Sequence, residues 1–206
     1  MPDRDDFLRE LHHRVKNNFQ IIASLMNLQK RMLAPERRSD LRFVEEHVQS
    51  MAVAYRIVST GSELVQVPIE DLVRETADNL RQIAGVRAER LQLDLSQDGA
   101  VIELNQGIVL GLYLAVVLPP QLDKVGRQGG ALVIRTAVTD NDLTISIAGV
   151  PVILSAMDFM RRRLIDAYVR QLRAEVANDE DAGGELRLRF GLEPARAVLS
   201  RRGGSS

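Results

Sequence analysis

The segment that decides the fold reads ELHHRVKNNFQIIASLMNLQ and spans residues 10–29. Apolar residues recur around it every three or four positions in two parallel rows. One row is Leu8, Leu11, Val15, Ile22 and Leu25, and the other is Phe19, Met26 and Leu33. This spacing matches the period of an α-helix and makes a broad apolar stripe along one side. We therefore expect an amphipathic helix over residues 5–33 with one buried face.

The polar side of this helix carries a histidine. At about 100° per residue, His13 falls nearly opposite the apolar rows and beside Lys16, Asn17 and Gln20. An exposed imidazole is nucleophilic near neutral pH, and nearby positive charge favours an added phosphoryl group. A lone exposed histidine is more often an ordinary solvated side chain, so spacing alone leaves both interpretations open.

A longer motif favours the first interpretation. His13-Arg14-x-x-Asn17, within residues 11–29, resembles the phosphoacceptor helix of the HRxxN and HWE-type sensor histidine kinases of bacterial two-component signalling. In that family the histidine directly before the arginine carries the phosphoryl group, which implies His13 as the phosphoacceptor. The adjacent His12 is then expected to be a packing residue. His47 lies in no comparable motif, and we expect a structural or surface role for it.

The resemblance also implies roles for the neighbours of His13. Arg14, Lys16 and Asn17 would orient the phosphoryl oxygens or the active-site loop of a docked partner. Glu10, one turn earlier, would hydrogen-bond the imidazole and fix its tautomer. Simpler alternatives stay open: Arg14 and Lys16 could form a solvated polar face, and Glu10 could pair with Arg14 at i,i+4.

Composition limits the partners and the chemistry. The 206 residues include 27 Lys plus Arg and 28 Asp plus Glu, giving a net charge of −1, so no general attraction to nucleic acid or to an anionic membrane is expected. No cysteine is present, and the three histidines lack HExxH spacing, so we expect no metal site. The longest apolar run, residues 108–118, is shorter than the ~20 residues of a membrane-spanning helix. These features predict a cytoplasmic protein.

A second helical pattern follows over residues 35–58, after a proline suited to opening a helix. Two long helices joined by a short turn form an antiparallel hairpin, for which we assign residues 1–62. A hairpin has too little interior to cover its own apolar stripe, so we expect a homodimer with a four-helix bundle. The alternative is that the hairpin packs on the rest of its own chain.

Residues 63–202 have a mixed pattern that predicts a second domain. Expected helices cover residues 69–83, 105–118 and 157–176; expected strands cover residues 91–95, 131–138, 143–148, 185–190 and 197–199. Residues 139–142 have turn chemistry and residues 178–184 are expected to be a loop. The fold class is α+β, with helices on one side of a mixed sheet. Residues 203–206 are expected to be a disordered tail.

This element order resembles the ATP-binding α/β sandwich of histidine kinases, but its nucleotide motifs are altered. The family's asparagine, acid and metal-binding asparagine on one helix align with Ala115, Val116 and Pro120. None of these side chains offers an oxygen to Mg²⁺. The pair Pro119-Pro120 is also expected to interrupt the helix that would present them.

Two further motifs of the resemblance are missing. The family's Asp-x-Gly-x-Gly reads Ile147-Ala148-Gly149-Val150-Pro151 here, so the carboxylate that binds adenine becomes Ile147 and the last glycine becomes Pro151. The glycine-rich phosphate loop is represented only by residues 154–157, which cannot form an equivalent cradle. Residues 181–183 contain a stray Asp-x-Gly that we expect to be a turn. ATP is therefore predicted to bind weakly or not at all.

The resemblance and its losses together predict a histidine phosphotransferase. His13 would shuttle a phosphoryl group between the receiver-domain aspartates of response regulators, without autokinase activity. The chain would bind no cofactor, because the receiver domain supplies the Mg²⁺. Two alternatives remain: a non-catalytic pseudokinase that sequesters a response regulator, and an active histidine kinase with an atypical ATP site.

Overall fold

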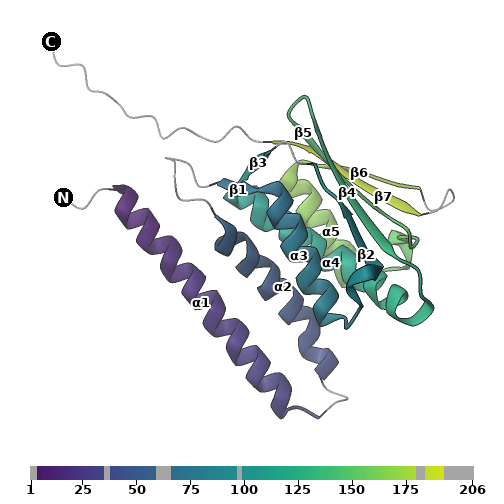
Figure 1. The fold of residues 1–206 in the computed structure, drawn as a ribbon, viewed down its shortest axis with the longest axis horizontal. Coiled ribbons are helices and arrows are strands. Elements are labelled where there is room, and N and C mark those ends of the chain that lie inside the picture. Colours follow the sequence, from purple (N-terminus) through teal and green to yellow (C-terminus); the bar gives the residue numbers. More distant parts are fainter. Residues whose placement is uncertain (1–3, 35–37, 59–65, 97–98, 180–183, 193–206) are drawn as a thin grey trace.

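The computed structural model describes residues 4–34, 38–58, 66–96, 99–179 and 184–192 (Figure 1), with side chains described from Arg14 onward except at residues 16 and 38–40. A helical hairpin precedes a domain in which helices cover one face of a sheet. The predicted α+β class and the order of hairpin and sheet domain are confirmed.

The hairpin consists of α1 (Arg4–Met32) and α2 (Arg38–Ile57), close to the predicted ranges. Aromatic rings join its two helices, since Phe19 of α1 stacks on Tyr55 of α2 with centroids 5.2 Å apart. An ion pair joins them nearer the turn, with Lys30 Nζ 2.6 Å from Glu45 Oε2. These two contacts hold the C-terminal half of α1 against α2.

The other side of α2 packs against the domain. Val53 and Ala54 are completely buried, and Ser50 is nearly so. The backbone of α2 comes so close to α4 (Leu104–Gln128) that a Cβ on Gly111 would lie 3.3 Å from the Ser50 carbonyl oxygen. The open alternative, packing on the chain's own domain, thus describes α2, whereas α1 contacts mainly α2 (Figure 1).

The domain contains two sheets. The larger has the strand order β2-β4-β5-β7-β6, with β2 parallel to β4 and the remaining neighbours antiparallel, so it is mixed as predicted. Its strands are β2 (Leu91–Asp94), β4 (Leu132–Thr139), β5 (Asp142–Ala148), β6 (Glu175–Asp179) and β7 (Glu185–Gly191). The smaller sheet pairs β1 (Gln66–Pro68) with β3 (Val101–Glu103).

Three helices cover one face of the larger sheet: α3 (Ile69–Ile83), α4 and α5 (Phe159–Leu172). The central one is α4, in which residues 113–118 are fully buried. By length and composition α4 could cross a membrane, but 72% of its apolar window is buried inside the protein. It is the core helix of this domain.

The structure corrects the expectation that Pro119-Pro120 interrupts a helix ending at residue 118. Both prolines lie inside α4, which continues to Gln128. Proline removes the backbone donor to the carbonyl four residues earlier, so the carbonyls of Ala115 and Val116 lose their helical partners. Burial on several sides holds the helix together despite this loss.

The end of the chain differs from prediction too. The helix expected to reach residue 176 ends at Leu172, because Arg173 adopts a left-handed conformation (φ 53°) in which its N–H and that of Ala174 close the helix. Residues 175–179 then form β6, which was missed, as were the three-residue strands β1 and β3. The predicted strand 197–199, the turn at 181–183 and the tail 203–206 lie outside the described residues.

Candidate functional site

The polar face of α1 carries the predicted acceptor motif. His13 lies within α1, as do Glu10, His12 and Lys16, although the side chains of these four lie outside the description. The side chains of Arg14 and Asn17 are exposed. Helical periodicity places His13 about one turn before Asn17, on the same side of the helix. The structure thus keeps Arg14 and Asn17 accessible on the helix that carries His13.

A second row of α1 faces its partner helix. Val15, Phe19, Ala23 and Met26 are half-buried, in keeping with the Phe19–Tyr55 stack. The packing face of the hairpin is therefore distinct from the face that carries Asn17. Contact with α2 leaves the side chains of Arg14 and Asn17 exposed.

A third row of α1 is apolar yet exposed. Its members are Ile21 (57% exposed), Leu25 (59%), Leu28 (56%) and Met32 (80%). Spacings of four, three and four residues place them on one stripe along the helix. Apolar stripes of this kind mark interaction surfaces. The predicted buried face of α1 is therefore split, with one row covered by α2 and another uncovered.

The region that the resemblance aligns with a nucleotide site begins on α4. Ala115 and Val116, which stand where the family has polar residues, are fully buried in the core. Pro120, which the resemblance aligns with a metal-binding asparagine, leaves the carbonyl of Val116 without its helical donor. That carbonyl accepts a hydrogen bond of 2.9 Å from Arg161 Nη1 on α5.

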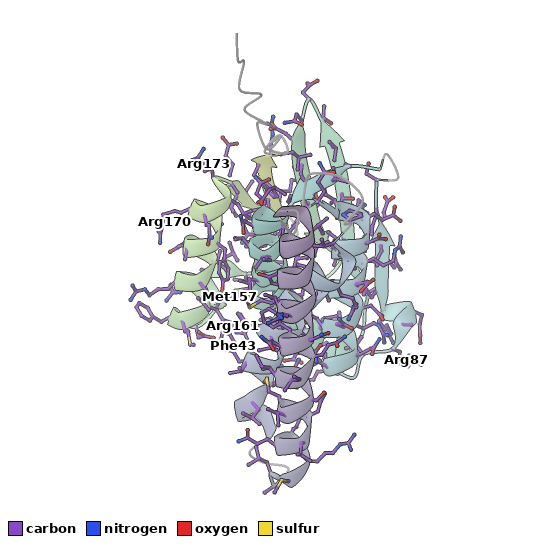
Figure 2. All side chains as sticks on the ribbon, turned by 90° about the vertical axis from the view of Figure 1, so that its left-hand side faces the viewer. Phe43, Arg87, Met157, Arg161, Arg170 and Arg173 are labelled. Carbon is purple, nitrogen blue, oxygen red and sulfur yellow. The ribbon has the colours of Figure 1, made fainter. Side chains whose placement is uncertain are left out.

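Arg161 therefore links three helices, and this link was missed from the sequence. Besides the Val116 carbonyl, its guanidinium lies 5.3 Å from the centroid of the Phe43 ring of α2. Figure 2 shows the two side chains next to each other. Its Nε also pairs with Asp158 at 3.3 Å. The sequence offered one signal, a proline pair followed some forty residues later by an arginine-rich helix start. This signal does not specify that Arg161 binds the Val116 carbonyl.

The end of β5 and the segment that follows it pack closely against other parts of the chain. Ile147, in place of the adenine-binding carboxylate, is 1% exposed within the sheet core. Gly149 (φ +91°) is held close to β4, because a Cβ there would lie 2.3 Å from the Ala131 carbonyl oxygen. Glycine is therefore needed at this position by the packing of this chain itself.

The backbone around Pro151 is occupied as well. Lys124 Nζ donates to its carbonyl at 3.0 Å, and the Val152 N–H donates to the Gly184 carbonyl at 2.8 Å. The next residues form a short 3-10 helix, Leu154–Ala156, followed by the buried Met157. The connection from β5 to α5 thus runs directly between the two elements, with its backbone groups engaged by the chain itself.

A charged network lies between α2 and α4 and was also missed. Arg42 pairs with Glu46 (Nε to Oε1, 2.8 Å) and with Asp123 (Nη2 to Oδ1, 2.9 Å). Burial raises the pKa of Glu46 despite the attraction of Arg42 and Arg161. The i,i+4 spacing of Arg42 and Glu46 was visible in the sequence, but the third partner comes from a distant helix.

His47 lies beside this network in a structural setting. Its Nδ1 is 2.7 Å from the Phe43 carbonyl oxygen, and its ring packs 4.2 Å from the Phe43 ring. Burial lowers the pKa of His47, and the nearby Arg161 adds to this effect. Among the described residues, no group of three or more His, Asp or Glu side chains is arranged to hold a metal ion.

Comparison with known proteins relates the first part of the chain to histidine kinases. Residues 10–84 match the family model HisKA_2, described as histidine kinase. Over 84 residues the chain is 32% identical to the sensor histidine kinase PdtaS of Mycobacterium tuberculosis, in strains CDC 1551 / Oshkosh and H37Rv. That alignment covers 40% of this chain and only 17% of the relative.

Solved structures extend the likeness to the whole described fold. The histidine kinase domain of the Erythrobacter litoralis EL346 blue-light activated histidine kinase aligns with a TM-score of 0.61 and 19% identity, covering 91% of this chain and 92% of that chain. A structure of the EL346 kinase itself aligns with a TM-score of 0.60 and 19% identity, covering 95% and 65%. The chain has the fold of a histidine kinase domain.

Proposed function

We propose that this chain is a histidine phosphotransferase in which His13 accepts a phosphoryl group from the aspartyl phosphate of one receiver domain and passes it to the aspartate of another. The matches to histidine kinases support a role in phosphohistidine signalling. Such a role belongs in the cytoplasm, and it needs only an accessible imidazole on a rigid helix and a docking surface.

One observation carries the choice of a phosphotransferase over a kinase. The chain's own groups occupy the elements that would hold a nucleotide: Arg161 binds the Val116 carbonyl, and the apolar Ile147 replaces a carboxylate. Phosphoryl transfer from ATP depends on metal and cationic groups that position the phosphates and neutralise their charge. Pro120, which the resemblance aligns with the metal-binding asparagine, has no side-chain oxygen to offer a metal.

The transfer step balances without a nucleotide. A lone pair on an imidazole nitrogen of His13 attacks the phosphorus of the receiver's acyl phosphate, and the P–O bond to the carboxylate breaks. The carboxylate leaves as an anion, and the imidazole loses a proton to solvent. Arg14, Lys16 and Asn17 support the charged oxygens, Glu10 orients the ring, and the receiver's Mg²⁺ neutralises the phosphate.

The proposed protein is a homodimer. The uncovered stripe formed by Ile21, Leu25, Leu28 and Met32 matches the apolar face that a second hairpin would bury. Because α2 is already packed on the domain, the interface would be built mainly from α1. A four-helix bundle of two hairpins would bury the stripe of α1 and still leave α2 packed on the domain.

The proposal is tested with a receiver domain carrying radiolabelled aspartyl phosphate and Mg²⁺. Label should move to the wild-type chain and to His12→Ala but not to His13→Ala. Equal labelling of both variants would refute the assignment of His13. A chain that binds receivers but never takes label would instead be a sequestering pseudokinase.

A calorimetric titration with magnesium ATP addresses the remaining alternative. We expect no binding in the low micromolar range and no self-labelling from radiolabelled ATP. Saturable heat followed by label on His13 would show an active kinase with an atypical site.

A further inference from the structure

The outer side of α5 is unusually basic for a chain with a net charge of −1. Five arginines and two aspartates lie between Asp158 and Arg173. Arg161 points inward to the Val116 carbonyl. The side chains of the other four are exposed: Arg162, Arg163, Arg170 and Arg173. Figure 2 shows Arg170 and Arg173 projecting to one side of the molecule.

These four arginines have no carboxylate partner within the described part of the chain. Most exposed arginines elsewhere do have one, such as Arg74 with Glu70 and Arg189 with Asp142. Asp158 pairs with Arg161 and also caps the helix by accepting from the Arg161 N–H at 2.9 Å. Asp166 is exposed among these arginines at helical spacing but forms no ion pair with them, so the face keeps a net positive charge that is only partly offset.

Exposed apolar side chains lie at the start of the same face. Phe159 is 67% exposed and Met160 is 56% exposed. The guanidinium of Arg163 lies 5.6 Å from the centroid of the Phe159 ring, so charge and aromatic surface are presented together. Arginine, phenylalanine and methionine are enriched in the centres of protein interfaces. We call this surface, formed by Phe159, Met160, Arg162, Arg163, Arg170 and Arg173, the α5 basic face.

The α5 basic face lies at the level of the acceptor segment. Both figures place α5 at the height of the N-terminal half of α1, the half that contains His13. In Figure 2, α1 is in front, and Arg170 and Arg173 of α5 extend beyond it to one side. A partner that docks on the polar face of α1 could therefore contact α5 with the edge of its binding surface.

We propose that the α5 basic face is a second docking contact for the receiver domain that exchanges phosphate with His13. This inference rests on the proposed function. A receiver active site holds Mg²⁺ with carboxylates, so its surroundings are acidic and complement unpaired arginines. Phe159 and Met160 provide the apolar centre of the contact, and the arginines provide steering and register.

An anionic membrane is a less suitable occupant. Membrane-binding helices carry an extended apolar face opposite their charges. In α5 that opposite face is occupied by the core residues Ile165 and Leu172, which are buried in the domain. Only one turn offers apolar side chains to the outside.

The test measures phosphoryl transfer from a phosphorylated receiver to the full chain. The variant reverses two charges, Arg163→Glu with Arg170→Glu. The control is Arg87→Glu, because Arg87 is an exposed arginine, paired with Glu89, that lies on the opposite flank in Figure 2. Rates are compared at about 50 mM and about 500 mM salt, which changes the screening length severalfold. Labelling of His13 by phosphoramidate, a small donor, reports whether the acceptor itself is intact.

We expect the double variant to raise the KM for the phosphorylated receiver about tenfold at low salt, with kcat and phosphoramidate labelling unchanged. The difference should shrink at high salt, and Arg87→Glu should behave like the wild type. Equal kinetics for variant and wild type, or an equal loss in Arg87→Glu, would overturn the inference. Unchanged transfer with lost binding to phosphatidylglycerol vesicles would assign the face to a membrane instead.

The two proposals can fail separately. If the wild type takes no phosphate from any receiver but binds one by calorimetry, and the double variant weakens that binding, docking stands while the phosphotransferase proposal fails. If transfer occurs equally in wild type and double variant, the phosphotransferase proposal stands while the docking proposal fails.

Discussion

At the scale of single residues, Arg161 supplies a hydrogen-bond donor that Pro120 removes from α4. Proline at position 120 cannot donate to the Val116 carbonyl, and a buried carbonyl without a partner costs about 1–3 kcal/mol. Arg161 supplies the missing donor at 2.9 Å. Its side chain is only 19% exposed, so this charge-assisted bond is largely protected from water.

This pairing predicts a non-additive double-mutant cycle. Arg161→Met should lower the free energy of unfolding by about 2–3 kcal/mol, because the bond to Val116 and the contact with Phe43 are both lost. In a Pro120→Ala background the helix regains its own donor, so the same change should cost about 1 kcal/mol less. Urea unfolding of the four proteins measures the cycle.

Arg162→Met is the control for that cycle, because Arg162 is exposed and lies next to Arg161 in sequence. It should change stability by less than about 0.5 kcal/mol. Additive effects of the Arg161 and Pro120 changes would show that the two residues act independently.

At the scale of elements, the interface between α2 and α4 contains partly buried ionisable groups. Arg42, Glu46 and Asp123 form the charged network, and Arg161 and His47 face it from α5 and α2. Glu46 is 1% exposed. The attachment of the hairpin to the domain should therefore respond to pH.

His47 gives this response a definite sign. Its pKa in the folded protein is lowered, chiefly by burial and further by Arg161, from about 6.5 in the unfolded chain. The folded state therefore favours the neutral ring. The resulting stability is fully present above the unfolded value and is lost as pH falls through the folded value.

We predict that the wild type loses more unfolding free energy than His47→Gln between about pH 7.5 and pH 5.5. Glu46, whose pKa is raised by burial, contributes in the opposite sense but is present in both proteins, so the difference isolates His47. Chemical unfolding at both pH values checks this. Parallel pH profiles for the two proteins would contradict it.

Sequence patterns predicted those elements whose periodicity is local. The range of α3 was predicted to the residue, because its buried positions recur at helical spacing. The β4–β5 hairpin was predicted from its turn, and the structure gives Asp140 and Asn141 the positive φ values such a turn needs. The predictions of α3 and of this hairpin both depend on sequence patterns that extend over about fifteen residues or fewer.

The misses depended on tertiary contacts. Nothing near Pro119-Pro120 reveals that Arg161 will serve a freed carbonyl, so a helix break was the natural but wrong expectation. The strand β6 was divided between the end of a predicted helix and a predicted loop, because its regularity comes from pairing with β7. In the candidate site, the helix of His13 and the exposure of Arg14 and Asn17 agree with prediction, whereas the role of His13 stays a prediction.

At the scale of the whole molecule, two surfaces remain available after the chain has folded: the apolar stripe of α1 and the α5 basic face. The stripe contains four of the ten large apolar residues that are exposed among those described. An uncovered apolar stripe of this size favours self-association.

We predict that Leu25→Glu with Leu28→Glu converts a dimer into a monomer, because burying two carboxylates without partners is costly. Sedimentation velocity at micromolar concentration measures the mass. The control is Val101→Glu on β3, an apolar residue 38% exposed outside the stripe, which should leave the dimer intact. A monomeric wild type would contradict the proposed assembly.

The joint between α4 and α5 has a consequence for substitutions at position 120. An asparagine there would return an intrahelical donor to the Val116 carbonyl, whose two lone pairs would then serve the backbone N–H and the Arg161 guanidinium together. The bridge from α5 therefore does not depend on proline at position 120, although it matters most when proline is there.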